Sequence, residues 1–198
     1  ENLNKLYAGL DKTTGRINED LMYRHWDSWV DEIPHIYLAS IQNGKVDIAN
    51  SVDILNGEPY ECPMRPWGGT EQYNYSPDGT KIAYTWRKKT GYEYSHSTNS
   101  DIYLYDIPTG ETTNVSEGIM GYDQNPVFSN NGQYLAWESM ERDGYESDKL
   151  RLMVLDLTTG ERVDLTKDFD YGVSGIEWSA DDSELYAVVM HRGYQEIF

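Results

Sequence analysis

The chain has 198 residues, which is enough for one domain with a sizeable core. Its 34 acidic and 16 basic residues give a formal net charge of −18, so it should repel phosphate backbones and anionic lipid headgroups, and we expect neither nucleic acid nor a membrane as partner. The 17 tyrosines and six tryptophans supply amphipathic bulk that suits sheets better than helices.

Residues 1–20 are expected to form a lead-in of helix and loop. Leu3, Leu6, Tyr7 and Leu10 fall at helical spacing, and the stretch DKTTG that follows predicts where the helix stops. The chain opens ENLNKLYAGL without an initiating Met and closes HRGYQEIF. We therefore expect both ends to be cut from something longer.

Residues 21–55 are expected to hold a partial unit of β-sheet. The aromatic run LMYRHWDSWV (Leu21 to Val30) predicts the second strand of this unit, whose first strand is missing. The phrase HIYLASIQNGKVDIA (His35 to Ala49) is a weaker copy of a phrase that recurs twice further on. Cys62 is the single cysteine, so no internal disulfide can form and the compartment stays open.

A repeat organises the rest of the chain. The segments YSPDGTKIAYTW, FSNNGQYLAWES and WSADDSELYAVV share an aromatic residue, a serine, a turn and a β-rich run. Their serines Ser76, Ser129 and Ser179 stand about 50 residues apart, and the phrases DIYLYDIPTGETTNV and RLMVLDLTTGERVDL repeat at the same interval. A period of this length is typical of propellers and solenoids.

The turn chemistry favours the propeller. Asp-Gly and Asn-Gly pairs ending at Gly79 and Gly132 predict one hairpin in each repeat, and Thr-Gly pairs ending at Gly110 and Gly160 predict a second. Two hairpins give four strands, which make one blade. We expect an all-β fold, namely a partial β-propeller of about three to four four-stranded blades behind a short N-terminal helix. Within one domain fragment over residues 1–198, the expected units are a partial blade (21–55), two complete blades (72–116 and 124–167) and an incomplete blade holding only its first two strands (174–198).

The strand order places all the long connections on one face. Tight turns within the hairpins lie on the opposite face, while the connections between second and third strands, and between blades, lie together. Long ordered loops on a rigid scaffold often carry function. Their Tyr, Trp and Arg content suits an interface, so they either bind a ligand or pack on another domain. These connections are Cys62 to Gln72, Arg87 to Ser100, Glu117 to Pro126, Ser139 to Lys149 and Asp168 to Ser174.

The patterns of catalytic and metal sites are missing from the sequence. GVSGI has Ile176 where a nucleophile elbow around Ser174 would need glycine. The four histidines are scattered without the spacing of metal ligands, and no paired histidine accompanies Cys62. We therefore expect no catalytic residue, no metal site and no cofactor in this chain.

Longer blocks resemble a known family. DLMYRHWDSWVDEIPH (Asp20 to His35), RPWGGTEQYNYSPDG (Arg65 to Gly79) and GYDQNPVFSNNGQYLAWESMERDGYESDK (Gly121 to Lys149) are similar to the prolyl oligopeptidase family of serine peptidases, and within it to dipeptidyl peptidase 5-type (acylaminoacyl-peptidase-like) enzymes. Many propellers share the Ser-Pro-Asp-Gly repeat, whereas these longer blocks are more specific.

The resemblance implies a larger enzyme. Such proteins pair an N-terminal propeller with a C-terminal α/β-hydrolase domain that carries a Ser-Asp-His triad, and they release dipeptides from the amino termini of oligopeptides. The propeller would act as a substrate-gating cap, with the peptide substrate and the hydrolase domain of the parent chain as its partners. This chain lacks the triad and would be inactive alone. The export of many bacterial members implies a periplasmic or secreted location.

The resemblance also suggests binding residues. In related dipeptidyl peptidases, acidic side chains from a propeller loop bind the substrate ammonium group. This sequence has no adjacent pair of glutamates, and the nearest equivalents are Glu138, Glu141 and Arg142. We expect one glutamate to anchor the amino terminus and Arg142 to orient it or a peptide carbonyl. The alternative for these residues is an interdomain salt bridge.

Two other interpretations stay open. A Tol-type propeller that binds protein partners without enzymatic activity would show the same repeat. A scaffold that pairs with another copy through its open blade edges would form a homo-oligomer, because such edges offer unpaired backbone groups.

Overall fold

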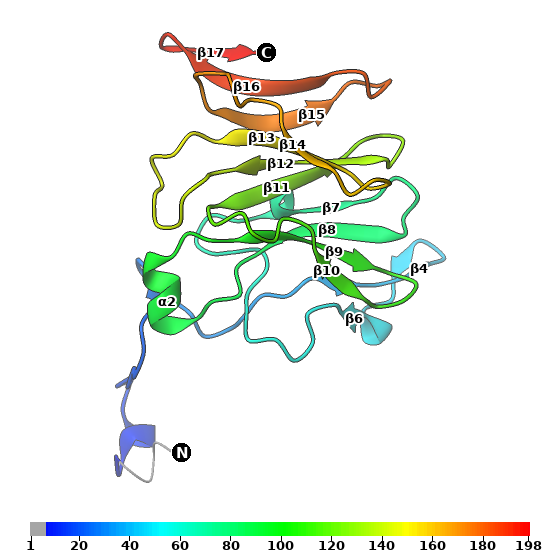
Figure 1. The fold of residues 1–198 in the computed structure, drawn as a ribbon. Helices are drawn as coiled ribbons and strands as arrows, with labels where there is room; N and C mark the ends of the chain where they lie inside the picture. The colour runs from blue at the N-terminus through cyan, green and yellow to red at the C-terminus, as the bar shows by residue number, and fades with distance from the viewer. Residues whose placement is uncertain (1–6) are drawn as a thin grey trace.

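The computed structural model describes residues 7–198 as a stack of antiparallel sheets (Figure 1). Two four-stranded sheets and one three-stranded sheet follow one another along the chain, and two-stranded ribbons precede them. Neighbouring strands in the three large sheets are also neighbours in the sequence, as in propeller blades. The predicted all-β partial propeller is confirmed. No helix in the described part of the chain is long and apolar enough to cross a bilayer.

Blade I is the four-stranded sheet of β7 to β10. Its second strand, β8, is buried along most of its length because other sheets cover both faces, which explains the unbroken run KIAYTW. The connection from β8 to β9 contains the short helix α2 (Gly91–His96). The strands are β7 (Tyr73–Tyr75), β8 (Lys81–Trp86), β9 (Asp101–Asp106) and β10 (Thr112–Asn114).

Blade II repeats this arrangement, and blade III has three strands rather than the expected two. The third strand, β17, was missed because the turn before it is the unusual pair Arg192 and Gly193, both with positive φ. This tight turn pairs His191 with Tyr194 across the hairpin. The strands of blade II are β11 (Asp123–Phe128), β12 (Tyr134–Ser139), β13 (Arg151–Asp156) and β14 (Arg162–Asp164). Those of blade III are β15 (Val173–Trp178), β16 (Leu185–His191) and β17 (Tyr194–Ile197).

The segment before blade I differs from the prediction. Leu21–Val30 does not form a blade strand: Trp26, with φ of 50°, reverses the chain so that the segment makes a separate two-stranded ribbon. The predicted N-terminal helix lies partly outside the described residues, and Leu10–Lys12 forms a 3₁₀ turn within them. The first ribbon pairs β1 (Arg24–His25) with β2 (Ser28–Trp29). Two others pair β3 (Tyr37–Leu38) with β6 (Val52–Asp53) and β4 (Ile41–Gln42) with β5 (Lys45–Val46).

Three hydrophobic clusters lie between successive sheets. Ile36 and Leu55 pack on Tyr84 and other aromatic side chains of blade I. Trp137 belongs to the cluster between blades I and II, and Val189 to the one between blades II and III. Trp137 is fully buried, so its truncation to alanine should cost about 3–5 kcal/mol. Face-to-face packing of sheets therefore fixes how the blades are stacked.

A repeated hydrogen bond joins each complete blade to the next. The first strand of blade II carries a bulge at Asn125 (φ 55°), and the first strand of blade III carries one at Gly175 (φ 59°). The Asn125 backbone N–H donates to the Thr85 hydroxyl at 3.1 Å, and the Gly175 N–H donates to the Glu138 carboxylate at 2.8 Å. Thr85 and Glu138 occupy the same place in β8 and β12. The backbone N–H at each bulge therefore finds its hydrogen-bond acceptor in the preceding blade.

The two ends of the strands carry different connections. The hairpin turns of blades I and II lie at the right-hand end in Figure 1, whereas α2, the long β12–β13 connection and the tight β16–β17 turn lie at the left-hand end. In the first of these turns the Asp78 carboxylate accepts hydrogen bonds from the Ser76 hydroxyl at 2.6 Å and from the Thr80 N–H at 3.0 Å. We call the left-hand end the loop face.

Candidate functional site

The loop face holds two adjoining cavities of about 470 and 400 Å³, which we call together the loop-face basin. Its walls come from four parts of the chain: the segment before β7 and the β8–β9, β10–β11 and β12–β13 connections. Both volumes fall in the range of small-ligand pockets. The residues common to both cavities are Arg65, Pro66, Arg87, Thr98 and Glu146.

Arg87 is the central cation of the basin. It directly follows β8, and its guanidinium lies 4.8 Å from the ring centroid of Tyr94 and 5.4 Å from that of Tyr122. One amino group donates to the Thr98 carbonyl at 3.4 Å, whereas the buried Nε has no hydrogen-bond partner among the described residues. Leaving a buried donor unpaired costs about 1–3 kcal/mol. The Nε is enclosed by the protein, and the guanidinium gives the basin its positive charge.

Arg65, in contrast, is neutralised. Its Nε lies 3.5 Å from Oε2 of the nearly buried Glu61, and its backbone N–H donates to Oε1 of the same carboxylate at 2.9 Å. The Tyr94 hydroxyl also donates to Glu61, at 2.6 Å. Burial, reinforced by this carboxylate, raises the pKa of the Tyr94 phenol. Because Arg65 is paired with Glu61, Arg87 is the arginine of the basin whose positive charge remains available to a ligand.

Glu146 is the carboxylate on the basin wall. It is exposed and belongs to the β12–β13 connection, which also contributes Met140 and Gly144 to the lining. Burial raises the pKa of Tyr122, the Arg87 guanidinium opposes that rise, and the Glu146 carboxylate adds to it. Positive and negative groups thus act on one tyrosine, so the basin can offer a cation and an anion to the same ligand.

The connections around the basin brace one another. The Asp143 carboxylate accepts hydrogen bonds from the Ser97 hydroxyl at 2.7 Å and from the N–H groups of Thr98 at 2.8 Å and Asn99 at 3.1 Å. The Gly144 N–H returns a hydrogen bond to the Thr98 hydroxyl at 2.9 Å. Burial would raise the pKa of Asp143, but these hydrogen bonds lower it below its usual value. The long connections are therefore ordered parts of a shared wall.

Glu138 lies inside the sheet and outside the basin lining. It is 2% exposed at the end of β12. Its carboxylate accepts hydrogen bonds from the Gly175 N–H at 2.8 Å and from the side-chain amides of Gln124 and Asn125 at 3.1 Å each. Burial raises the pKa of this carboxyl, although the hydrogen bonds moderate the rise. Its geometry is that of a tie between blades II and III.

Glu141 and Arg142 are both exposed, and neither lines the basin. The Arg142 backbone N–H and Nε each donate to Asp148 at 2.9 Å, and the guanidinium lies 4.0 Å from the ring centroid of Tyr145. The side-chain hydrogen bond from Arg142 holds the pKa of Asp148 below its usual range. Arg142 is therefore engaged with Asp148 of its own connection. Glu138, Glu141 and Arg142 do not lie together in one site.

Other groups considered in the sequence occupy ordinary structural positions. Ser174 lies within β15, so it is not on a strand-to-helix elbow. Cys62 is fully buried, and this burial raises the pKa of its thiol. Within residues 7–198, no group of three or more His, Cys, Asp or Glu side chains is arranged to hold a metal ion.

Exposed tryptophans border the basin. Trp67, one of its lining residues, is 74% exposed and meets the 69% exposed Trp26 edge to face at 4.6 Å between ring centroids. An exposed aromatic pair of this size is typical of a surface that another body covers.

The comparisons with known proteins give a sequence relation and a fold relation. No family model matches the chain. Dipeptidyl-peptidase 5 of Porphyromonas gingivalis is 55% identical over 181 residues, covering 91% of this chain and 26% of that protein. The proteins of the same name from Porphyromonas endodontalis (55% identity, 74% of this chain, 21% of that protein) and Aspergillus fumigatus (28%, 98% and 29%) also match. The chain spans about a quarter of the length of these relatives.

Among solved structures, TolB from Acinetobacter baumannii superposes with a TM-score of 0.53 at 20% identity, covering 82% of this chain and 34% of that one. An oligogalacturonate lyase in complex with manganese gives 0.51 at 16% identity, covering 75% and 37%. At these identities the likeness shows the fold alone.

The stacked sheets and their bulged first strands define the chain as a segment of a β-propeller. Within that class, its sequence is homologous to one segment of the proteins named dipeptidyl-peptidase 5. The resemblance inferred from the longer sequence blocks is confirmed.

Proposed function

We propose that this chain is the propeller part of a dipeptidyl peptidase whose loop face covers a hydrolase domain and whose basin receives the amino-terminal end of an oligopeptide. The similarity to dipeptidyl-peptidase 5 proteins over 91% of the chain supports this function. The catalytic residues belong to another part of the parent protein in this proposal.

The observation that carries the proposal is the pairing of Arg87 and Glu146 in one basin. A peptide amino terminus presents an ammonium group and, within a few ångströms, carbonyl oxygens. Glu146 offers the negative charge for the ammonium, and the guanidinium of Arg87, which lines both cavities, offers a positive charge and N–H groups for a carbonyl. The rings of Tyr94 and Tyr122 hold the guanidinium in place.

The exposed pair Trp26 and Trp67 supports the cap role. Both side chains lie beside the basin and leave large apolar surfaces in water. A domain placed over the loop face would bury them and would narrow the entrance to the basin, which is how a cap excludes bulky substrates.

The binding roles of Glu138, Glu141 and Arg142 stay predictions. The three side chains differ in how easily a substrate could reach them. Glu138 could contact a substrate only by giving up donors that join two blades. Glu141 is exposed near the basin wall, so it is the member of this set that a substrate could reach without such a loss. Replacing Glu138 and Glu141 by Gln in the full-length enzyme tests them, and an unchanged kcat/KM for dipeptide release would refute their role in binding.

The assignment of Glu146 is tested by comparing two substrates in the full-length enzyme. A dipeptide p-nitroanilide and its N-acetylated form differ at the amino terminus, where an uncharged acetamide replaces the ammonium group. We expect Glu146→Gln to reduce the preference for the free amino terminus about tenfold or more, which corresponds to about 1.4 kcal/mol of lost pairing energy. Glu161→Gln, an exposed carboxylate on the opposite end of blade II, is the matched control. An unchanged preference in Glu146→Gln would remove Glu146 from the site.

We also propose a periplasmic or secreted location, which rests on the family resemblance. Fractionation of the source cells with antibody against the protein tests this location, and recovery in the cytoplasmic fraction would contradict it.

A further inference from the structure

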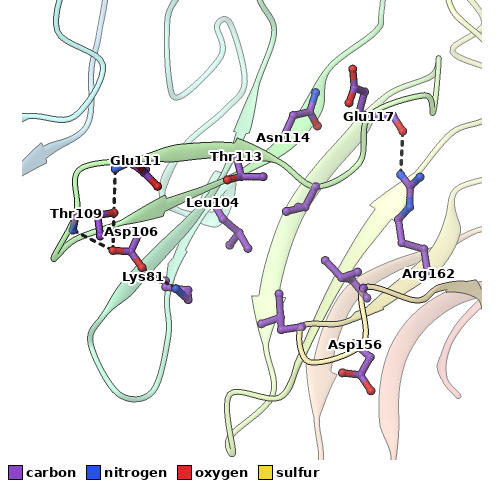
Figure 2. A pocket seen from close by; sticks show the side chains of 14 residues that line it. Lys81, Leu104, Asp106, Thr109, Glu111, Thr113, Asn114, Glu117, Asp156 and Arg162 are labelled. Atoms are coloured by element: carbon purple, nitrogen blue, oxygen red, sulfur yellow. Dashed lines mark hydrogen bonds and ion pairs between the residues drawn. The ribbon is translucent and has the colours of Figure 1, made fainter.

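A second cavity lies on the side of the molecule, where blades I and II diverge. It has a volume of about 580 Å³ and shares no lining residue with the loop-face basin. Figure 2 shows it between the outer strands of blade I and the β13–β14 hairpin of blade II. We call it the interblade groove. Its volume is that of a pocket for a ligand of peptide-fragment size.

The floor of the groove is apolar. Leu104 of β9 and Val115 face Leu155 and Leu157 of blade II, and all four pack in or against the hydrophobic cluster between the blades. Leu104, Val115 and Leu157 are only partly buried, so these side chains form the outer margin of the core. An apolar side chain inserted there would extend the core rather than disturb it.

The rim is acidic. Glu111 and Glu117 are exposed on the blade I side, and Asp156 lies on the blade II side (Figure 2). The Asp156 carboxylate accepts hydrogen bonds from backbone N–H groups of its turn, and these hold its pKa below its usual range, so it is charged at neutral pH. Three carboxylates therefore surround the apolar floor.

The cations in the lining are already engaged. Lys81 donates to Asp106 at 2.8 Å, and this hydrogen bond is the main cause that lowers the pKa of Asp106 to about 2. Arg162 crosses from blade II to donate to the Glu117 carbonyl at 3.0 Å, as Figure 2 shows. These contacts leave the field at the rim negative.

The internal repeat shows that this acidity is not a requirement of the blade. Thr113 and Glu117 correspond, one repeat later, to Val163 and Lys167. The same positions of blade II therefore carry an apolar group and a positive charge. Glu111 recurs as Glu161, so among the blade I rim carboxylates Glu117 is the one that the repeat does not retain.

From this charge complementarity we propose that the interblade groove binds an extended peptide segment of a partner protein, with an apolar side chain on the floor and lysine or arginine on each side. Leucine or valine would contact Leu104, Val115 and Leu155, and the flanking cations would pair with Glu111, Glu117 and Asp156. Binding at this place would leave the loop face accessible.

The experiment uses the full-length protein and the peptide Lys-Leu-Leu-Lys-amide with fluorescein attached to its α-amino group, which keeps both lysine side chains charged and blocks cleavage as a dipeptidyl substrate. Fluorescence anisotropy should show saturable binding that weakens as salt is raised. Glu-Leu-Leu-Glu-amide labelled in the same way should bind at least tenfold more weakly. Equal affinity for the two peptides, or no saturation at millimolar protein, would overturn the proposal.

Variants then locate the binding. Glu117→Lys reverses the rim charge, and Thr113→Trp fills the groove, so each should weaken binding of the basic peptide at least tenfold. Glu177→Lys makes the same charge reversal at an exposed residue of β15 in blade III, away from the groove lining, and should leave the affinity unchanged. Circular dichroism confirms that each variant is folded. If Glu117→Lys and Thr113→Trp are folded and bind as the unmodified protein does, the groove is not the site.

Discussion

Asp123 is the first residue of β11. Ionisation of its carboxyl should make the free energy of unfolding of the protein decrease as pH rises. Its side chain is fully buried, and neither carboxylate oxygen has a hydrogen-bond partner of good geometry among the described residues. Burial raises its pKa from 3.8 to about 7, although the neighbouring groups of Ser139, Ser116 and Trp137 moderate the rise. A rise of this size corresponds to about 4 kcal/mol.

The sign of the effect follows from the two protonation states. Below about pH 4 the Asp123 carboxyl is protonated in the folded and unfolded chain alike, so it imposes no ionisation penalty. Between about pH 4 and pH 7 the unfolded chain releases the proton while the folded chain keeps it, so the free energy of unfolding decreases. Above about pH 7 both states are ionised, and the penalty stays at its full value.

Asp123→Asn tests this reasoning because it removes the titration and keeps the shape. Urea unfolding of the wild-type protein and the variant should be measured from pH 4 to pH 8.5, with Glu161→Gln as an exposed control. The wild-type free energy of unfolding should fall relative to that of Asp123→Asn by about 4 kcal/mol across this range. Parallel curves for the two proteins would refute the assignment of a buried, proton-binding Asp123.

Three further predictions concern the blades and the basin. Glu138→Gln keeps one oxygen that can accept from the Gly175 N–H, but it turns an NH₂ group toward the side-chain amides of Gln124 and Asn125, which need an acceptor. It should lower the free energy of unfolding by about 1–3 kcal/mol in urea titrations, whereas Glu161→Gln should change it by less than about 0.5 kcal/mol. Equal effects would contradict the role of Glu138 in joining blades II and III. Gly121→Ala should destabilise the protein by about 1–3 kcal/mol and lower kcat/KM in the full-length enzyme, because the added methyl would overlap the Met140 carbonyl oxygen beside the basin. Wild-type stability and kinetics in the variant would contradict this close approach. We also predict that the 198-residue chain self-associates through blade III, where β17 leaves an open strand edge and Tyr186, Met190 and Ile197 are exposed; a monomer by light scattering at millimolar concentration would contradict this.

The repeat made the blades predictable. The Asp-Gly, Asn-Gly and Thr-Gly pairs mark hairpins whose glycines need positive φ, and Gly79, Gly110, Gly132 and Gly160 all have it. Continuous apolar runs such as Lys81–Trp86 report burial on both faces. Local chemistry therefore determined both the turns and the strands between them.

The failures in the fold have local causes as well. Trp26 and Arg192 adopt positive φ although their side chains disfavour it, and each reverses the chain where no glycine or asparagine occupies that position. The first turn converts the expected blade strand into the β1–β2 ribbon, and the second adds β17.

The candidate site was predicted as a face but not as a set of residues. Strand order places the long connections together, which is enough to find the surface. It does not say that Glu138, by the alternation of β12, lies within the stack of blades, or that Arg142 pairs with Asp148 inside its own loop. Glu146 and Arg87 were missed because their proximity depends on how two loops pack, for which Asp143 supplies the hydrogen bonds. A single sequence gives no direct signal of such a contact.

The most direct test of the proposed function is a structure of the full-length protein with a non-hydrolysable oligopeptide bound. The proposal predicts the peptide ammonium within salt-bridge distance of the Glu146 carboxylate and a peptide carbonyl at the Arg87 guanidinium, with Trp26 and Trp67 buried under the hydrolase domain. A peptide amino terminus bound elsewhere, with the loop-face basin open to solvent, would contradict it.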